Sequence, residues 1–235
     1  MEGKGEVGVG QHPKCLPVKV CGITRAEDGQ AAIQAGASAL GFIFYPPSPR
    51  YISPERVASM ILELPASAVK VGVFVGTGAE DINRVVAQCG LNWVQLHGGE
   101  PADLMAQLNC PAYRAFRLKE QSDMAMVNDA PDRMVLLDTF DPDHYGGTGR
   151  PFNWDWARKI AAGRQVILAG GLTPGNAVRA VGAACPAGLD VSSGVETSPG
   201  IKDAAKLAEF FYVLREAGYS GPSPWSMDDA SGIKD

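Results

Sequence analysis

The sequence predicts an α/β protein folded as a single (β/α)8 TIM barrel. Eight short apolar runs rich in Val and Ile alternate along the chain with segments that have the amphipathic pattern of helices. Continuously apolar runs are typical of parallel strands that are covered on both faces. The 235 residues, 46% of them hydrophobic, suffice for one sizeable core. An open doubly wound sheet would also satisfy the strand pattern, but the strand number and the length favour the barrel.

The eight apolar runs define the expected strands. In chain order they cover residues 18–22, 38–44, 69–75, 92–96, 112–116, 133–138, 165–170 and 188–193.

Amphipathic segments between these runs define the expected helices. They include residues 25–37, 53–64, 79–90, 100–108, 154–162 and 173–184. The Ser-Pro pair at 53–54 and the Thr-Pro pair at 173–174 are typical helix starts. The hydroxyl of Ser or Thr caps the first turn, and proline fits the first position of a helix, where an N–H would have no partner. Glycine is common just after a helix, and three of these helices are expected to stop at Gly36, Gly90 and Gly163.

The composition excludes several classes of protein. The net charge is −5, and Lys and Arg are scattered, so neither nucleic acid nor a membrane surface is expected as a partner. No run approaches the roughly 18 apolar residues of a membrane helix, and the polar start lacks a signal peptide. We therefore expect a cytoplasmic protein, either monomer or homodimer. Residues 1–15 and 219–235, rich in Gly, Ser and Pro, are expected to be mobile extensions of a barrel domain at 16–218.

Cysteine and histidine spacing indicates no metal site or disulfide scaffold. The five cysteines include no CxxC pair, and the three histidines form no HxxxH-like pair. No metal and no organic cofactor are expected.

Polar and small residues follow the apolar runs at the ends where chemistry occurs in this architecture. Active sites of such barrels lie at the carboxyl ends of the strands. The residues found there are Cys21, the loop 45–51 with Arg50, Gln95, His97, Arg114, Arg117, Asp138, Gly170, Gly171, Ser192, Ser193 and Gly194.

The residues after the last two strands predict a phosphate site. Gly170 and Gly171 follow the seventh strand, and Ser192, Ser193 and Gly194 follow the eighth. Each group alone would fit an ordinary tight turn. Glycines let backbone N–H groups approach an anion closely, and these two loops are the usual phosphate site of the barrel. Together they favour a small phosphorylated substrate.

Two ionisable groups are candidates for proton transfer. Asp138 ends an apolar strand, where desolvation suits a general acid, although a helix cap or an ion pair would also explain it. The loop after it contains Gly146, Gly147 and Gly149 and is expected to act as a lid or substrate loop. Cys21 alone would be a packed strand residue, but it is the only cysteine at a strand's carboxyl end.

Two further side chains have open roles. His97 could bind substrate or transfer a proton, and a hydrogen bond to the backbone is equally compatible with its position. Arg50 follows a proline-stiffened loop and could hold a carboxylate or phosphate, or simply be solvated.

Seven motifs, in order from residue 18 to 217, resemble phosphoribosylanthranilate isomerase. They are "KVCGIT", "ALGFIFYPPSPRYISP", "VGVFV", "VQLHGGE", "LLDT" with "GGTGRPFNW", "LAGGLTPGN" and "DVSSGVETSPGIKD". The resemblance implies a (β/α)8 barrel of tryptophan biosynthesis. The implied reaction is the Amadori rearrangement of N-(5-phosphoribosyl)anthranilate to 1-(2-carboxyphenylamino)-1-deoxyribulose 5-phosphate, without a cofactor.

The resemblance also assigns residue roles. Cys21 would be the general base, Asp138 the general acid, and Arg50 would face the anthranilate carboxylate. The backbones of Gly170, Gly171, Ser192, Ser193 and Gly194 would bind the phosphate, with Gln95, His97 and Gly147 as further substrate-binding candidates. A thiol acts as a base only when part of it is thiolate, which requires a depressed pKa or a favourable local field.

Two positions depart from the family pattern. Gly76 stands where the family often has Asn, and Asn153 where it often has Asp. A related isomerase of histidine biosynthesis would have aspartate in place of Cys21, and indole-glycerol-phosphate synthase would have a lysine at a strand end. A non-catalytic sugar-phosphate-binding barrel remains the alternative of a different class.

Overall fold

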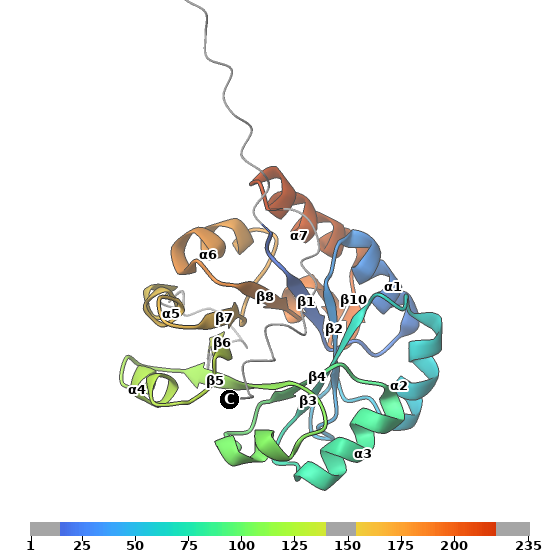
Figure 1. Ribbon diagram of the computed structural model, residues 1–235. Helices are drawn as coiled ribbons and strands as arrows, with labels where there is room; N and C mark the ends of the chain where they lie inside the picture. The colour runs from blue at the N-terminus through green and yellow to red at the C-terminus, as the bar shows by residue number, and fades with distance from the viewer. Residues whose placement is uncertain (1–14, 140–153, 220–235) are drawn as a thin grey trace, which may run out of the picture.

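The computed structural model describes residues 15–139 and 154–219, and within them eight parallel strands close into a barrel (Figure 1). Each strand pairs with the next in sequence, and β8 pairs back with β1, so the barrel has no edge. The predicted barrel is confirmed and the open sheet is excluded. The strands are β1 (Val18–Cys21), β2 (Ala39–Ile43), β3 (Val69–Phe74), β4 (Trp93–Leu96), β5 (Ala112–Leu118), β6 (Met134–Thr139), β7 (Gln165–Leu168) and β8 (Gly188–Val191).

Helices surround the barrel (Figure 1). The α-helices are α1 (Ala26–Ala35), α2 (Pro54–Met60), α3 (Ala79–Cys89), α4 (Asp123–Asn128), α5 (Trp154–Ala161), α6 (Ala177–Ala184) and α7 (Ala204–Glu216). The 3-10 helices are η1 (Ile61–Glu63), η2 (Ala102–Gln107) and η3 (Ser193–Val195). A short hairpin of β9 (Glu196–Ser198) and β10 (Ile201–Lys202) lies between η3 and α7. No helix in the described ranges is long and apolar enough to span a membrane.

Strand alternation separates two layers of core. Side chains of a strand point to opposite faces in turn, so those of β1 alternate between the helices and the barrel interior. Val18 and Val20 belong to the large cluster between strands and helices. Lys19 and Cys21 therefore face the interior. The interior apolar layer is smaller and consists of Ala39, Val71, Trp93, Tyr113, Ala115, Leu136, Ile167 and Ala169.

Several predicted helix ends match the structure. Ser53 caps α2 by accepting a hydrogen bond from the Arg56 N–H. Gly36 follows α1 with φ 124°, and Gly90 follows α3 with φ 54°, conformations that glycine adopts without strain. Helix α5 ends at Ala161, two residues before Gly163.

Other predicted elements differ. The predicted helix start at Thr173 is wrong by three residues, since Asn176 is the N-cap of α6. Asn176 Oδ1 accepts a hydrogen bond from the Thr173 N–H, which closes a turn before the helix begins. Residues 100–108 contain the 3-10 helix η2 rather than an α-helix. Helices α4 and α7 complete the expected strand–helix alternation but had no predicted bounds, although the buried Leu207, Phe210, Phe211 and Leu214 give α7 a clear apolar face.

Removal of the Phe210 ring tests the place of α7 in the core. Phe210 is fully buried, whereas Tyr212 on the same helix is 55% exposed. We expect Phe210→Ala to lower the free energy of unfolding by about 3–5 kcal/mol, since it leaves a cavity. Tyr212→Ala should change it by no more than about 0.5 kcal/mol. Urea denaturation of both variants measures the difference, and equal effects would contradict this packing.

Candidate active site

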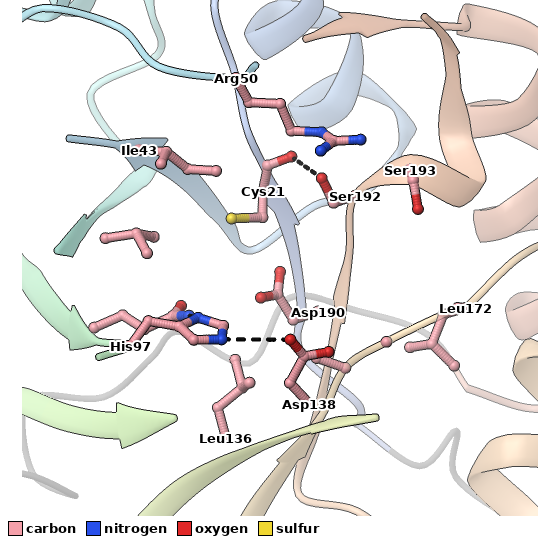
Figure 2. A pocket seen from close by; sticks show the side chains of 15 residues that line it. Cys21, Ile43, Arg50, His97, Leu136, Asp138, Leu172, Asp190, Ser192 and Ser193 are labelled. Atoms are coloured by element: carbon pink, nitrogen blue, oxygen red, sulfur yellow. Dashed lines mark hydrogen bonds and ion pairs between the residues drawn. The ribbon is translucent and has the colours of Figure 1, made fainter. Parts of the chain in front are cut away.

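A cavity of about 310 Å³ opens at the carboxyl ends of the strands (Figure 2). It brings together most of the residues predicted from the sequence. Those lining it are Cys21, Arg50, Gln95, His97, Asp138, Gly170, Gly171, Ser192 and Ser193, joined by Ile43, Val73, Leu136, Ala169, Leu172 and Asp190. Arg114 is not among them, since it pairs with Asp132. Gly147 and Asn153 lie outside the described residues.

Cys21 ends β1 and faces the cavity with 7% of its surface exposed. Its carbonyl oxygen accepts hydrogen bonds from Ser192 Oγ at 3.0 Å and from Lys202 Nζ at 2.6 Å, which hold the strand end in place. Gly41 lies opposite in β2, where a Cβ atom would be 2.8 Å from the Cys21 sulfur. The thiol therefore depends on a glycine in the neighbouring strand for its space.

Burial raises the pKa of the Cys21 thiol above its ordinary value, and the Lys19 cation opposes this rise without cancelling it. Lys202 also favours the thiolate, whereas Asp190 disfavours it. The structure thus supplies a favourable local field from two lysines, but it does not depress the thiol's pKa. Burial therefore favours the neutral thiol over the thiolate at Cys21.

Lys19 is a fully buried cation beneath the cavity. Its Nζ donates to Asp190 Oδ2 at 2.7 Å and to Gln95 Oε1 at 3.0 Å. Burial alone would lower the pKa of Lys19, but the attraction of Asp190, with smaller effects of Cys21 and Tyr113, raises it above its ordinary value. Lys19 therefore remains an ammonium. Asp190 Oδ1 is buried and has no hydrogen-bond partner among the described residues.

A chain of polar contacts runs from Lys19 to Asp138. Gln95 Oε1 also accepts from the Tyr113 hydroxyl at 3.1 Å, and Gln95 Nε2 lies 2.9 Å from His97 Nδ1. On the other side of its ring, His97 Nε2 lies 3.3 Å from Asp138 Oδ2 (Figure 2). Arg117 Nε is 3.7 Å from the same carboxylate oxygen. Gln95 and His97 thus connect a buried cation to the carboxylate of β6.

A second charged cluster lies at the mouth of the cavity. Arg50 donates from Nε and Nη2 to the carboxylate of Glu196, with Nη2 2.7 Å from Oε2. Lys202 Nζ donates to Glu196 Oε1 at 2.8 Å. Burial alone would raise the pKa of Glu196, but the hydrogen bonds from Arg50 and Lys202 outweigh it and hold the pKa below its ordinary value. The hairpin β9–β10 thereby fixes the Arg50 guanidinium over the site.

The loops after β7 and β8 pack directly on each other. Gly170 has φ 82° and Gly171 has φ 61°, which an L side chain rarely adopts. At Gly194 a Cβ atom would be 1.8 Å from the Leu172 carbonyl oxygen. A second hollow shares Gly171 and Ser193 with the main cavity and is also lined by Lys206. Gly194 is therefore packed against the loop after β7, whereas Gly170 and Gly171, which have no side chains to cover their backbone, line the main cavity.

Gly76, which departs from the family pattern, has φ 62°. This is the left-handed region that Gly and Asn share, so the exchange of one for the other fits the loop. Its N–H donates to Glu100 Oε1 at 2.7 Å.

The fold and the cavity define a (β/α)8-barrel enzyme whose site combines a thiol, a carboxylate and two backbone loops suited to an anion. The family model of N-(5'phosphoribosyl)anthranilate (PRA) isomerase matches residues 18–213. The N-(5'-phosphoribosyl)anthranilate isomerase of Trichlorobacter lovleyi is 44% identical over 203 residues, which cover 86% of this chain and 99% of that protein. The chain belongs to the phosphoribosylanthranilate isomerase family.

Solved structures agree with this family. The phosphoribosyl anthranilate isomerase of Thermotoga maritima is 39% identical and superposes with a TM-score of 0.80, covering 86% of this chain and 99% of that one. A phosphoribosyl anthranilate isomerase in complex with reduced 1-(o-carboxyphenylamino)-1-deoxyribulose 5-phosphate is 37% identical, with a TM-score of 0.76. It covers 86% of this chain and 99% of its own.

Sequence reasoning missed the charged residues that support the site. These are Lys19, Asp190, Glu196, Lys202 and Lys206. One signal was available, since strand alternation places Lys19 on the same face of β1 as Cys21.

An added methyl group tests the contact between the two loops. Gly194→Ala forces its Cβ into the Leu172 carbonyl, and we expect this overpacking to lower the free energy of unfolding by about 1–3 kcal/mol. Gly182→Ala is the matched control, because a Cβ there meets no atom within 4 Å. Since Gly182 lies within α6, that change should stabilise the chain by about 0.5–1 kcal/mol. Thermal or urea unfolding compares them, and equal stability would contradict the packing.

Proposed function

We propose that this chain converts N-(5-phosphoribosyl)anthranilate into 1-(2-carboxyphenylamino)-1-deoxyribulose 5-phosphate in tryptophan biosynthesis, with Cys21 as general base and Asp138 as general acid. The observation that carries the residue roles is that both side chains line one cavity, from β1 and β6 (Figure 2). Family membership supports the reaction. That the protein is cytoplasmic, as a monomer or a homodimer, stays a prediction.

The rearrangement needs one acid and one base. Asp138 donates its proton to the ring oxygen of the ribose, the C1–O bond breaks with its electron pair on oxygen, and the anthranilate nitrogen forms an iminium at C1. The Cys21 thiolate then removes the C2 proton, which gives an enolamine that tautomerises to the ketone. One proton is delivered and one is removed, so the step is a net isomerisation.

The field around Cys21 suits this role despite burial. A base that is mostly protonated still acts through its thiolate fraction, and a thiolate whose conjugate acid has a high pKa is the stronger base. Lys19 and Lys202 both favour the thiolate form. The thiol packs against Gly41 of the neighbouring strand, where a Cβ atom would lie 2.8 Å from the sulfur.

The two anionic groups of the substrate have separate partners in this proposal. The phosphate binds at the backbones of Gly170, Gly171, Ser192, Ser193 and Gly194, where glycine allows close approach. Arg50 receives the anthranilate carboxylate. Glu196 engages Nε and Nη2 of Arg50, which leaves Nη1, unpaired among the described residues, for a second carboxylate. Support comes from the related isomerase that binds a reduced deoxyribulose phosphate carrying a carboxyphenylamino group.

Turnover by single variants tests the two assignments. We expect Cys21→Ser and Asp138→Asn each to lower kcat by about 10²- to 10⁴-fold, because each removes one proton-transfer group. Cys185→Ser and Asp129→Asn are matched controls at exposed positions and should keep wild-type turnover. The assay measures formation of the carboxyphenylamino deoxyribulose phosphate as a decrease in the fluorescence of the substrate.

Two outcomes would overturn different parts of the proposal. Full activity of both Cys21→Ser and Asp138→Asn would contradict the acid and base roles. A wild-type protein that binds the substrate without converting it would instead indicate the non-catalytic sugar-phosphate-binding barrel.

A further inference from the structure

We propose that His97 is a positioning residue for the catalytic acid. The Nε2–H of His97 interacts with Asp138 Oδ2, so the proton that Asp138 donates to the substrate lies on Oδ1. Gln95 determines which nitrogen of the His97 ring is protonated. This inference rests on the proposed acid role of Asp138. It also changes the expected role of Gln95 and His97 from binding substrate to holding the acid.

The orientation of the Gln95 amide follows from Lys19. The ammonium of Lys19 can only donate, so the Gln95 atom 3.0 Å away from it is the carbonyl oxygen. The Tyr113 hydroxyl approaches the same oxygen at 3.1 Å. The other end of the amide, Nε2, is then the atom 2.9 Å from His97 Nδ1, and it is a donor. Gln95 is 1% exposed, which keeps its amide from turning toward solvent.

The Gln95 donor determines the tautomer of His97. Because Nδ1 accepts a hydrogen bond, it holds the lone pair, and the proton of the neutral ring lies on Nε2. Nε2 is inaccessible to solvent, and Asp138 Oδ2 lies 3.3 Å from it, although its alignment is poorer than that of a full hydrogen bond. Catalytic hydrogen bonds are often long or poorly aligned in enzymes without substrate and tighten in the catalytic complex. Nδ1 is hydrogen-bonded to Gln95, and Nε2 is closed to solvent and faces the Asp138 carboxylate, so the imidazole is directed toward the acid rather than toward a substrate.

Within residues 15–139 and 154–219, the side-chain contacts of Asp138 are on one of its two oxygens. His97 Nε2 and Arg117 Nε both approach Oδ2, at 3.3 and 3.7 Å. A protonated carboxyl group whose one oxygen accepts a hydrogen bond carries its proton on the other. The proton therefore leaves from Oδ1 to the ring oxygen, and the carboxylate that remains is already paired with the His97 N–H through Oδ2.

Nitrogen-15 NMR of histidine-labelled protein measures the tautomer directly. The chain has only three histidines, and His97→Gln identifies the signal of His97 by its loss. We expect the wild type at pH 8 to show a protonated Nε2 and an unprotonated Nδ1. Gln95→Glu should move the proton to Nδ1, because a carboxylate can only accept there. A wild-type ring protonated on Nδ1, or one averaging between tautomers, would overturn the proposal.

Steady-state kinetics separates positioning from substrate binding. Since a misplacement of about 1 Å can cost about 100-fold in rate, we expect His97→Leu to lower kcat by about that factor with little change in KM. His97→Gln should recover most of the loss, because its amide N–H reaches nearly the place of Nε2–H. Gln88→Glu, on the surface of α3, is the matched control for Gln95→Glu and should keep wild-type values.

The outcomes distinguish this inference from the proposed function. A raised KM with unchanged kcat in His97→Leu, or no recovery by His97→Gln, would mean that His97 does not position the acid. Full activity of Asp138→Asn would remove the acid role itself, whatever the tautomer is. If His97→Leu fails to fold, the wild-type tautomer and the activity of His97→Gln still decide the question.

Discussion

The active site depends on one buried cation, the ammonium of Lys19, which lies inside the barrel among apolar side chains. An unpaired charge there would be prohibitively costly, and loss of one partner of a buried pair costs about 3–5 kcal/mol. Asp190 compensates the charge at 2.7 Å, across the seam where β8 pairs with β1 and where Lys19 and Asp190 are register partners. Closure of the barrel and formation of the charged site are thus coupled, because the Lys19–Asp190 ion pair forms only when β1 and β8 meet.

The ammonium acts on both sides of the cavity. On one side it shares the inner face of β1 with Cys21 and favours the thiolate against the effect of burial. On the other it orients Gln95, and through Gln95 the His97 ring beside Asp138. The second cluster, built on Glu196, links the Cys21 strand end to the arginine at the cavity mouth through Lys202.

Sequence patterns predicted the parts of this structure that are local. The period and composition of the apolar runs located all eight strands, and the rule that active sites lie at the carboxyl ends of barrel strands placed Cys21 and Asp138 at the same cavity. Helix α6 begins later than its Thr-Pro pair suggested because the Asn176 side chain caps a turn first. The ion pairs could not be predicted, since Lys19 and Asp190 are 171 residues apart and Arg50 and Glu196 are 146 apart. Such partners follow from strand register and hairpin placement, which hydrophobic patterning does not specify.

The rate at which Cys21 reacts with iodoacetamide, followed by mass spectrometry of its peptide across a pH series, tests the role of the buried cation most directly. In Lys19→Met the thiolate loses the nearest positive charge, so the rise in alkylation rate should move to higher pH than in the wild type. Cys185, exposed at the end of α6, reports the reagent's own pH dependence in the same sample. A Cys21 profile that is the same in both proteins would contradict the claim that Lys19 organises the site.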